Sequence, residues 1–486
     1  MANGGIIGTV NNPTSSTATG VWQQEEQYEA VRDGTWPSRP LFTTKSLRFN
    51  RGSSDFLRRT MSTAGTSDKV GTYSGWVKRS TVSLDGMFFE GKDLAANNYT
   101  QIYFLATGKL TIYGSTGPMD IVTTALFRDP SAWYHVVVAF DTTQGTASNR
   151  VKIYVNGTQF TSVTNGNGDA AQYPSQNSTI YFGVNGDQQG IGIREDGALL
   201  WNGYMSEIIY VDGQALAPTS FGVANSSGFW TPIIYTGTYG NNGFNLQFEN
   251  AAALGTDSSP NGNTFTVSNL TSLDQTTDYP KNNFCTINPL TNGTQRNPTL
   301  SEGNVFLTNT SGAWMNCMSS FAVSRGKWYF EIKPTLHGTS YCHAGIFPVD
   351  DWENEVSGYP NYGGTANSWS YDNAGNIVNN DGNANTSPAT YTTNDIIGIA
   401  VDLDGNKFYA YKNNALQVSG GSAIGANIEY YFGGMGYNTS IAFNFGNPSY
   451  ANTSSVADEN GYGAFEFAPA SGYLAICSKN LGSDGG

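Results

Sequence analysis

The sequence has few cysteines, few basic residues and no long apolar run. Its four cysteines show no CxxC spacing, so neither a zinc site nor a disulfide framework is indicated; they are Cys285, Cys317, Cys342 and Cys477. No stretch approaches the length of a membrane span, and residues 1–16 lack the basic start and the apolar run of a signal peptide. We therefore expect no membrane insertion and synthesis in a cytoplasm.

Basic residues are outnumbered by acidic ones, 24 to 38, and the formal net charge is −14. Binding to phosphate backbones requires clustered Lys and Arg, so this balance argues against nucleic acid as a partner. Residues 32–79 are the exception, because ten Lys or Arg there stand against three Asp, which gives +7 and leaves −21 for the rest. Two interpretations of this segment stay open: a solvated basic face, or a docking surface for an acidic partner protein.

Glycine and aromatic residues are abundant. The chain has 58 Gly, and its aromatic share of 13% equals that of all charged residues together. Many glycines indicate many turns, and the rings suit the cores of β-sandwiches. Because 486 residues are too many for one such sandwich, the composition predicts an all-β protein of more than one domain.

The stretch DIIGIAVDLDGNKFYAYKNN, residues 395–414, contains the segment DLDGN, which suits either a calcium loop or a tight turn. An EF-hand loop beginning at Asp402 would need glycine at its sixth position and glutamate at its twelfth, where the chain has Lys407 and Asn413. The apolar alternation of residues 397–401, followed by Asp-Gly and an aromatic run, predicts a β-hairpin. A calcium site of another type in this loop is the alternative.

An earlier stretch has the same pattern. WYHVVVAFD, from residue 133, and VKIYVNG, from residue 151, are again an apolar strand that ends in Asp, a polar loop, and a second strand that ends in a turn. The two hairpins predict two antiparallel jelly-roll-type β-sandwiches, joined by a connector and preceded by a short N-terminal arm. The expected bounds are 1–40 for the arm, 41–222 for the first sandwich, 223–295 for the connector, 296–481 for the second sandwich and 482–486 for a tail.

Both predicted sandwiches resemble known domains. In the first, WYHVVVAFD, VKIYVNG and WNGYMSEIIYVDGQALA resemble a concanavalin A-like, laminin G-type domain, with the family's pattern at Trp133, His135, Trp201, Gly203 and Glu207. In the second, GKWYFEIKP, AGIF and the 395–414 hairpin are similar to SPRY-type domains. Laminin G-type domains often hold a structural calcium ion, for which the sequence does not identify ligands; no other cofactor is expected.

The arm and the connector resemble segments of structural proteins from tailed phages, especially marine ones. The arm segment is STATGVWQQEEQYEAVRDGTWP, with a short helical stretch over residues 23–31 and three large rings, Trp22, Tyr28 and Trp36. These rings either dock the arm onto other phage structural proteins or pack it onto its own first domain. The resemblance implies a virion-associated protein.

Catalytic chemistry has little support, and we expect no enzyme activity. Glycoside hydrolysis needs two carboxyl groups that face one cleft, and the nearest such pair, Glu353 and Glu355, lies in a stretch with loop character. His135, His337 and His343 are interpreted as structural, since no third group completes a Cys–His nucleophile near Cys342.

Glycan recognition is better supported, by a loop of the second sandwich. This loop, residues 350–373, is rich in Gly and Asn and contains Trp352, Tyr359, Tyr362 and Trp369. Aromatic rings stack on sugar rings, and amides bind sugar hydroxyls. The alternative is that the rings pack the loop onto its sandwich.

Together these patterns predict a phage virion surface protein, a capsid decoration or short-fibre head that is present in several copies or as a homo-oligomer. It would be assembled in the host cytoplasm, lie on the exterior of the particle and hold host cell-surface glycans weakly, with avidity from copy number. A tail-tip receptor-binding adhesin is the second hypothesis, and a glycan-degrading enzyme is the third.

Overall fold

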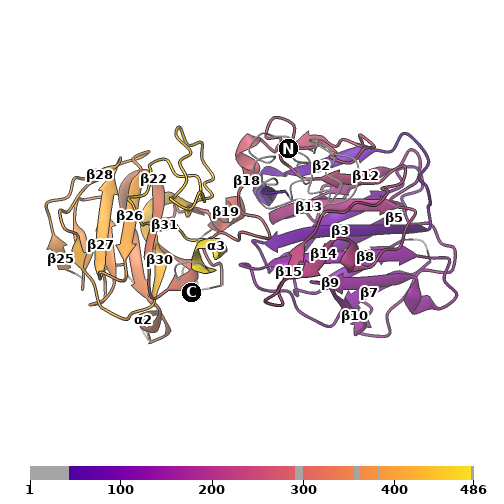
Figure 1. The fold of residues 1–486 in the computed structure, drawn as a ribbon, viewed down its shortest axis with the longest axis horizontal. Helices are drawn as coiled ribbons and strands as arrows, with labels where there is room; N and C mark the ends of the chain where they lie inside the picture. The colour runs from indigo at the N-terminus through magenta and orange to yellow at the C-terminus, as the bar shows by residue number, and fades with distance from the viewer. Residues whose placement is uncertain (1–42, 116, 291–298, 355–361, 381, 483–486) are drawn as a thin grey trace, which may run out of the picture. The chain divides into compact units, whose positions relative to one another are not determined.

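The computed structural model describes residues 43–482 apart from 116, 291–298, 355–361 and 381. The predicted arm, its helical stretch and its anchors Trp22, Tyr28 and Trp36 lie outside this part of the chain. The fold class is confirmed, because the described residues form two antiparallel β-sandwiches with little helix (Figure 1). None of the helices within them has the length and apolar character needed to cross a lipid bilayer.

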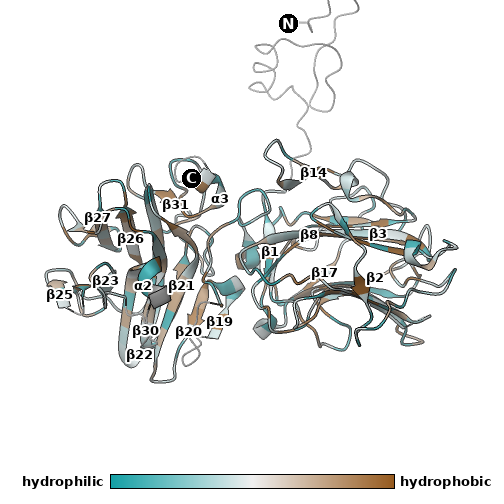
Figure 2. Ribbon diagram, turned by 90° about the horizontal axis from the view of Figure 1, so that it is seen from below, coloured by the Kyte–Doolittle hydropathy of each residue, from teal (hydrophilic) through white to brown (hydrophobic). Residues whose placement is uncertain are grey.

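The first sandwich consists of two eight-stranded sheets, called sheet I and sheet II, which form separate layers in Figure 2. Sheet I runs in the order β10 (Thr158–Phe160), β9 (Val151–Val155), β8 (Trp133–Asp141), β3 (Val70–Arg79), β13 (Gly203–Asp212), β1 (Ser46–Phe49) and β18 (Gln275–Thr276), with β16 (Phe244–Leu246) paired to β13. Sheet II runs in the order β11 (Val163–Thr164), β7 (Met119–Thr123), β6 (Leu110–Gly114), β5 (Tyr99–Phe104), β4 (Gly86–Lys92), β12 (Gln188–Ile191), β2 (Phe56–Thr60) and β17 (Thr266–Ser268).

Aromatic rings fill the space between sheets I and II. Phe89 stacks on Phe182 with 4.3 Å between ring centroids, and Tyr73, Tyr210 and Phe244 pack around this pair. The predicted hairpin of this domain is confirmed, since β8 and β9 pair antiparallel. Edge-to-face and offset ring pairs add to the burial of apolar area, and Leu, Ile and Val side chains from both sheets complete this core.

Part of the segment that the sequence indicated as a connector belongs to the first sandwich. Its short strands β16 and β18 complete sheet I, and β17 completes sheet II. Farther along, Phe284, Cys285 and Ile287 are fully buried in cores of the second sandwich. The sequence GFNLQFEN, which contains β16, indicates a strand, whereas β17 and β18 are two or three residues long and form only where a sheet edge is available to pair with them.

The second sandwich is built around two long strands, β22 (Lys327–Pro348) and β30 (Tyr430–Asn444). One half of this strand pair continues into β20 (Phe306–Thr308) and β26 (Ile397–Asp402), and the other half into β21 (Trp314–Val323) and β23 (Trp369–Asp372). The other strands are β19 (Thr299–Ser301), β24 (Ile377–Asn379), β25 (Gly382–Asn385), β27 (Lys407–Lys412), β28 (Ala415–Leu416), β29 (Ser422–Ala423) and β31 (Leu474–Ala475); the helices are α2 (Val349–Asn354) and α3 (Ser478–Asn480).

The DLDGN segment forms the predicted hairpin turn. β26 and β27 pair from Ile397 opposite Lys412 to Asp402 opposite Lys407. The Asp402 carboxylate accepts a hydrogen bond from the Gly405 N–H at 2.6 Å. It also forms an ion pair with the Lys327 ammonium at 3.1 Å. The aspartate therefore has a structural role in the turn.

The buried Lys and Arg residues of the basic segment, residues 32–79, make contacts inside the protein. Eight cations of this segment are described, and four are buried, while the other four are half-buried; the buried ones are Arg48, Arg59, Lys78 and Arg79. Arg79 donates to the Phe127 carbonyl at 3.0 Å and lies 4.7 Å from the centroid of the Phe104 ring. The four buried cations therefore belong to neither a solvated face nor a docking surface, whereas for the four half-buried ones both interpretations stay predictions.

Lys78 makes the most deeply buried ion pair. Its ammonium donates to Asp278 Oδ2 at 2.8 Å and to Asn283 Oδ1 at 2.7 Å, and the Trp133 indole donates to the other oxygen of Asp278 at 2.9 Å. Lys78 and Asp278 have 1% and 0% of their side chains exposed. Both charges can be buried because the ion pair and its hydrogen bonds offset the cost of removing them from water.

We predict that Asp278→Ala lowers the free energy of unfolding by about 3–5 kcal/mol, because it leaves the Lys78 ammonium buried and unpaired. Urea denaturation followed by circular dichroism measures this. Asp68→Asn is the control: it breaks the half-exposed Lys69–Asp68 pair and should cost less than about 1 kcal/mol. The double variant Lys78→Met, Asp278→Leu should regain most of the loss. Equal effects of Asp278→Ala and Asp68→Asn would contradict the prediction.

Candidate functional site

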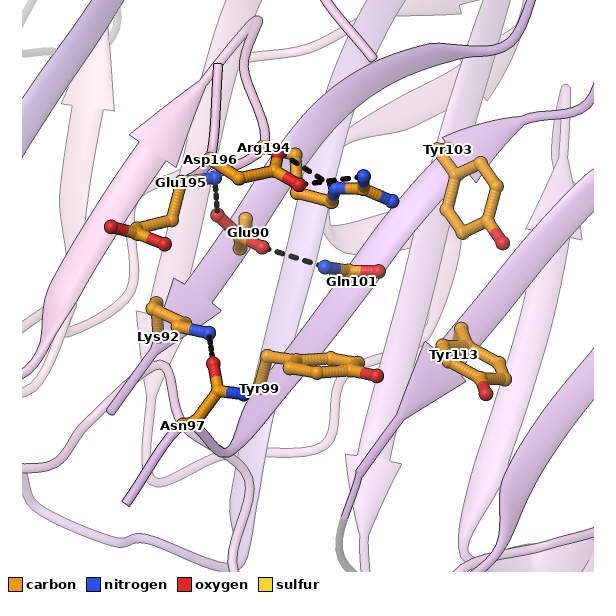
Figure 3. A pocket seen from close by; sticks show the side chains of 10 residues that line it. All are labelled: Glu90, Lys92, Asn97, Tyr99, Gln101, Tyr103, Tyr113, Arg194, Glu195 and Asp196. Atoms are coloured by element: carbon orange, nitrogen blue, oxygen red, sulfur yellow. Dashed lines mark hydrogen bonds and ion pairs between the residues drawn. The ribbon is translucent and has the colours of Figure 1, made fainter. Parts of the chain in front are cut away.

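The outer face of sheet II carries a polar pocket of about 420 Å³. Strands β4, β5 and β6 and the loop after β12 supply its lining, which consists of Glu90, Lys92, Asn97, Tyr99, Gln101, Tyr103, Tyr113, Arg194, Glu195 and Asp196. The volume lies in the range of small-molecule sites, roughly 300–1,000 Å³. Figure 3 shows Glu90 and Gln101 between the rings of Tyr103 and Tyr113 on one side and the charged side chains on the other.

Strand register places these side chains together. Glu90 on β4 lies opposite Gln101 on β5, which lies opposite Tyr113 on β6. Side chains of directly opposed residues lie on the same face of a sheet. One row across three strands therefore presents a carboxyl group, an amide and a phenol ring, and Tyr99 stacks beside Tyr113 with 6.0 Å between centroids.

Glu90 lies at the floor of the pocket and is 2% exposed. Its Oε1 accepts from Gln101 Nε2 at 2.6 Å, and its Oε2 accepts from the Glu195 N–H at 2.5 Å. Burial raises the pKa of Glu90 to about 7, and these two hydrogen bonds oppose that rise. Near neutral pH this group can therefore exist either as an acceptor or as a hydrogen-bond donor.

Two cations flank the floor and are held by partners within the pocket. Arg194 makes a bidentate pair with Asp196, with Nε–Oδ1 at 2.9 Å and Nη2–Oδ2 at 2.7 Å. This pairing lowers the pKa of Asp196 and raises that of Arg194. Lys92 donates to Asn97 Oδ1 and lies 5.2 Å from the centroid of the Tyr99 ring.

The lining combines aromatic faces with fixed donors and acceptors. Tyr113 is 37% exposed, and Tyr99 and Tyr103 are half-buried, so the rings are available at the pocket surface. Carbohydrates present C–H faces beside hydroxyls, and this lining offers ring faces for the first and carboxyl, amide and guanidinium groups for the second. The chemistry of the pocket thus matches a saccharide.

The four aromatic residues of the loop predicted to bind glycans lie in different environments. Tyr359 and the side chain of Trp352 lie outside the described residues. Tyr362 is 1% exposed, packs against Phe347 and donates its hydroxyl to the Cys317 carbonyl at 2.7 Å, so it has no face for a sugar. Trp369 is half-buried on β23 against the core. For Tyr362 the alternative of packing is the correct one.

Two of the three histidines are buried in hydrogen-bonded positions. His135 contacts the Ser74 hydroxyl at 2.8 Å, and its Nδ1 accepts from the Trp230 indole at 2.8 Å; burial lowers its pKa to about 3. His343 lies 3.0 Å from the Ser370 hydroxyl, and burial lowers its pKa to about 4. The pKa of the neighbouring Cys342 thiol is raised by burial. These environments favour neutral, structural side chains.

No metal centre of the usual side-chain type is evident in the described residues, where no three His, Cys, Asp or Glu are grouped to hold an ion. The calcium ion that the laminin G resemblance implied stays a prediction. Glu353 belongs to α2, with its side chain outside the described part, and Glu355 lies outside it altogether.

Sequence reasoning missed the pocket of sheet II. The alternation in TQIYF and LTIYG identifies Gln101, Tyr103 and Tyr113 as candidates for the outward face. That signal does not show which residues of neighbouring strands are opposed, and Glu90 follows two adjacent phenylalanines that break the alternation of β4.

The raised pKa of Glu90 generates a pH prediction. The folded protein keeps a proton that the unfolded chain releases, since its pKa is about 7 in the fold against 4.5 as the ordinary value. This stabilisation is full below pH 4.5 and is lost as the pH rises through 7. Relative to the wild type, Glu90→Gln should gain up to about 3 kcal/mol between pH 4.5 and pH 8. Urea denaturation at a series of pH values measures the difference.

Gln101→Leu is the matched variant, because it removes a hydrogen bond that favours the carboxylate form of Glu90. It should move the midpoint of the pH-dependent difference to higher pH. Parallel stability profiles for the wild type and Glu90→Gln would contradict the assignment.

Comparison with known proteins identifies both sandwiches. Residues 52–208 match the model of the concanavalin A-like lectin/glucanases superfamily, and residues 327–447 match that of the SPRY domain. The first match spans the strands that line the pocket. No curated protein matches the sequence.

Solved structures that resemble parts of the chain include two SPRY domains and a pentraxin. The SPRY domain of human HERC1 is 17% identical, with a TM-score of 0.26, over 32% of this chain and 96% of that one. A human SPRY domain is 16% identical, with a TM-score of 0.22, over 29% and 90%. A heptameric SAP-like pentraxin from Limulus polyphemus is 18% identical, with a TM-score of 0.26, over 36% and 77%. On its fold and its two family matches, this chain is an all-β protein with a concanavalin A-like domain followed by a SPRY domain.

Proposed function

We propose that the concanavalin A-like domain binds a saccharide in the pocket on sheet II. The observation that carries the proposal is the cross-strand row of Glu90, Gln101 and Tyr113, with Tyr99 stacked beside it. The rings stack on the C–H faces of a sugar, while the polar side chains that line the pocket exchange hydrogen bonds with its hydroxyls. Membership of a lectin/glucanase superfamily supports this ligand class.

The partners of these groups are already in place. Gln101 holds Glu90, Arg194 holds Asp196, and Asn97 holds Lys92, so the polar side chains need little reordering when the ligand enters. Preorganisation reduces the entropy that binding loses. The pocket is open and polar, which favours weak affinity and makes several copies of the site useful.

We propose binding and not hydrolysis. A glycosidase needs one carboxyl group as acid and another as nucleophile or base across the scissile bond. In this pocket Asp196 is bound at both oxygens by Arg194, and both oxygens of Glu90 accept hydrogen bonds. Hydrolysis is the second candidate, favoured by the raised pKa of Glu90, which suits a general acid. Release of reducing ends from a bound polysaccharide would establish it.

We further propose that this binding takes place on the exterior of a phage particle, as a capsid decoration or short-fibre head, with a tail-tip adhesin as the alternative. The support is the resemblance of the arm, residues 1–40, and the connector to segments of phage structural proteins. The arm would attach the domains to capsid or tail proteins.

Tyr113→Ala and Gln101→Ala should each weaken saccharide binding by about tenfold, because each removes one ring face or one set of hydrogen bonds. A glycan array identifies the ligand, and calorimetry with the best hit measures affinity. Tyr154→Ala is the control, since Tyr154 is a half-buried tyrosine on β9 of sheet I. Equal losses in the control and pocket variants, or unchanged affinity in the pocket variants, would refute the site.

Antibodies raised against residues 296–481 should label intact particles in electron microscopy. Label over the head would support a decoration, and label at the tail would support an adhesin. If intact phage particles that should carry this protein bind no antibody, the virion proposal is overturned. The proposal of a saccharide site is not affected by that result.

A further inference from the structure

Three aromatic side chains lie side by side on the outer face of the SPRY domain. Trp314 on β21 is opposite Tyr437 on β30, and Tyr437 is opposite Tyr341 on β22. Centroid distances are 5.5 Å for Trp314–Tyr341, 5.7 Å for Trp314–Tyr437 and 6.1 Å for Tyr341–Tyr437. We call these three residues the aromatic row.

The aromatic row faces away from the main core of the domain, and Trp314 also packs against a smaller buried cluster of Met318, Phe347, Tyr362 and Met435. The neighbours of the row along the strands, Met315 and Cys342, point to the opposite face and pack in the main core of the domain. Tyr341 is 47% exposed, and Trp314 and Tyr437 are half-buried. Because large rings normally seek burial, three contiguous, partly exposed rings on adjacent strands are a candidate binding surface.

The surroundings of the aromatic row are polar but uncharged. No Lys, Arg, Asp or Glu occurs in residues 303–324, 334–348 or 430–457, which include the three segments that form it. The nearest carboxylate by register is Asp372, which lies opposite His343, two residues beyond Tyr341 on β22. Asp372 is 8% exposed and accepts two hydrogen bonds from Asn376. In a chain of net charge −14, this neutrality sets the surface apart.

Hydroxyl and amide groups flank the rings. Thr339 is exposed and Ser340 is half-buried in the irregular stretch of β22 that precedes Tyr341. The Asn438 amide is fixed beside them, since it donates to the Thr339 carbonyl at 3.1 Å and accepts from the Gly312 N–H at 2.7 Å. The surface thus offers ring faces beside neutral hydrogen-bonding groups.

We propose that the aromatic row is a second saccharide-binding surface, specific for neutral sugars. It is independent of the pocket on sheet II, which contains five ionisable acidic and basic residues. The neutral surroundings exclude charge pairing with an acidic or basic ligand as the source of affinity. The hydroxyl and amide groups that flank the rings, on Thr339, Ser340 and Asn438, are the donors and acceptors that sugar hydroxyls need.

Affinity electrophoresis of the full chain in native gels tests the proposal. The gels contain dextran, laminarin or yeast mannan as neutral polysaccharides, and alginate as an acidic comparison. The double variant Tyr341→Ala, Tyr437→Ala should raise the dissociation constant for at least one neutral polysaccharide about tenfold. Mobility in alginate should not change. The variant Tyr341→Phe keeps the ring and should retain most of the affinity, which separates ring stacking from loss of fold.

Two further variants separate this site from the pocket. Phe229→Ala is the matched control, because Phe229 is 71% exposed on another domain and should have no effect. If Tyr113→Ala abolishes all retardation while the row variant behaves as wild type, the aromatic row proposal fails and the pocket stands. If the row variant alone reduces retardation, the row stands and the pocket fails.

Other outcomes overturn the proposal directly. The proposal fails if none of the three neutral polysaccharides retards the wild-type protein. Another such outcome is a change from dimer to monomer in the row variant, measured by light scattering, with unchanged retardation, which would assign the surface to contact with a second copy of the chain.

Discussion

Offsets in strand register determine which side chains both candidate sites present. On β4 a bulge between Met87 and Phe89 admits two successive phenylalanines to the core and turns Glu90 outward, opposite Gln101. On β22 and β30 the register shifts between Leu336 and Tyr341. Before this shift Ile441 points to the core, and after it Phe432 does, so the inward positions of β30 change from odd to even numbers. Without that change Tyr437 would point inward, and the aromatic row would not exist.

Several of the protein's cations are buried and paired with internal groups. A chain that is acidic overall places several of its cations inside, where each has an internal partner: Lys78 has Asp278, and Arg79 has backbone carbonyls and the ring of Phe104. Buried charges that are paired hold segments in one arrangement, at a desolvation cost that the pairing offsets. The segment after the first sandwich is held in this way, and its short strands become part of sheets I and II.

The two domains offer surfaces of related chemistry but different charge. The pocket on sheet II combines tyrosines with acidic and basic groups around Glu90, and the aromatic row combines rings with neutral amides and hydroxyls. If both proposed sites bind saccharides, two weak sites on one chain would give retention on a glycan surface that neither site gives alone. Such a design suits attachment that must be broad and reversible.

The sequence by itself determined the all-β class, the two sandwiches and the 402–407 turn, because alternation, glycine-rich turns and aromatic strands are local signals. It also indicated a structural position in a strand for His135, which is buried and hydrogen-bonded on β8. Only the tertiary structure decided which rings are exposed: Tyr362 is buried, whereas Tyr113 and Tyr341 are open. It likewise decided that four of the cations of residues 43–79, namely Arg48, Arg59, Lys78 and Arg79, are buried. These outcomes depend on strand register and on partners distant in sequence, such as Asp278 for Lys78, and no local pattern carries that information.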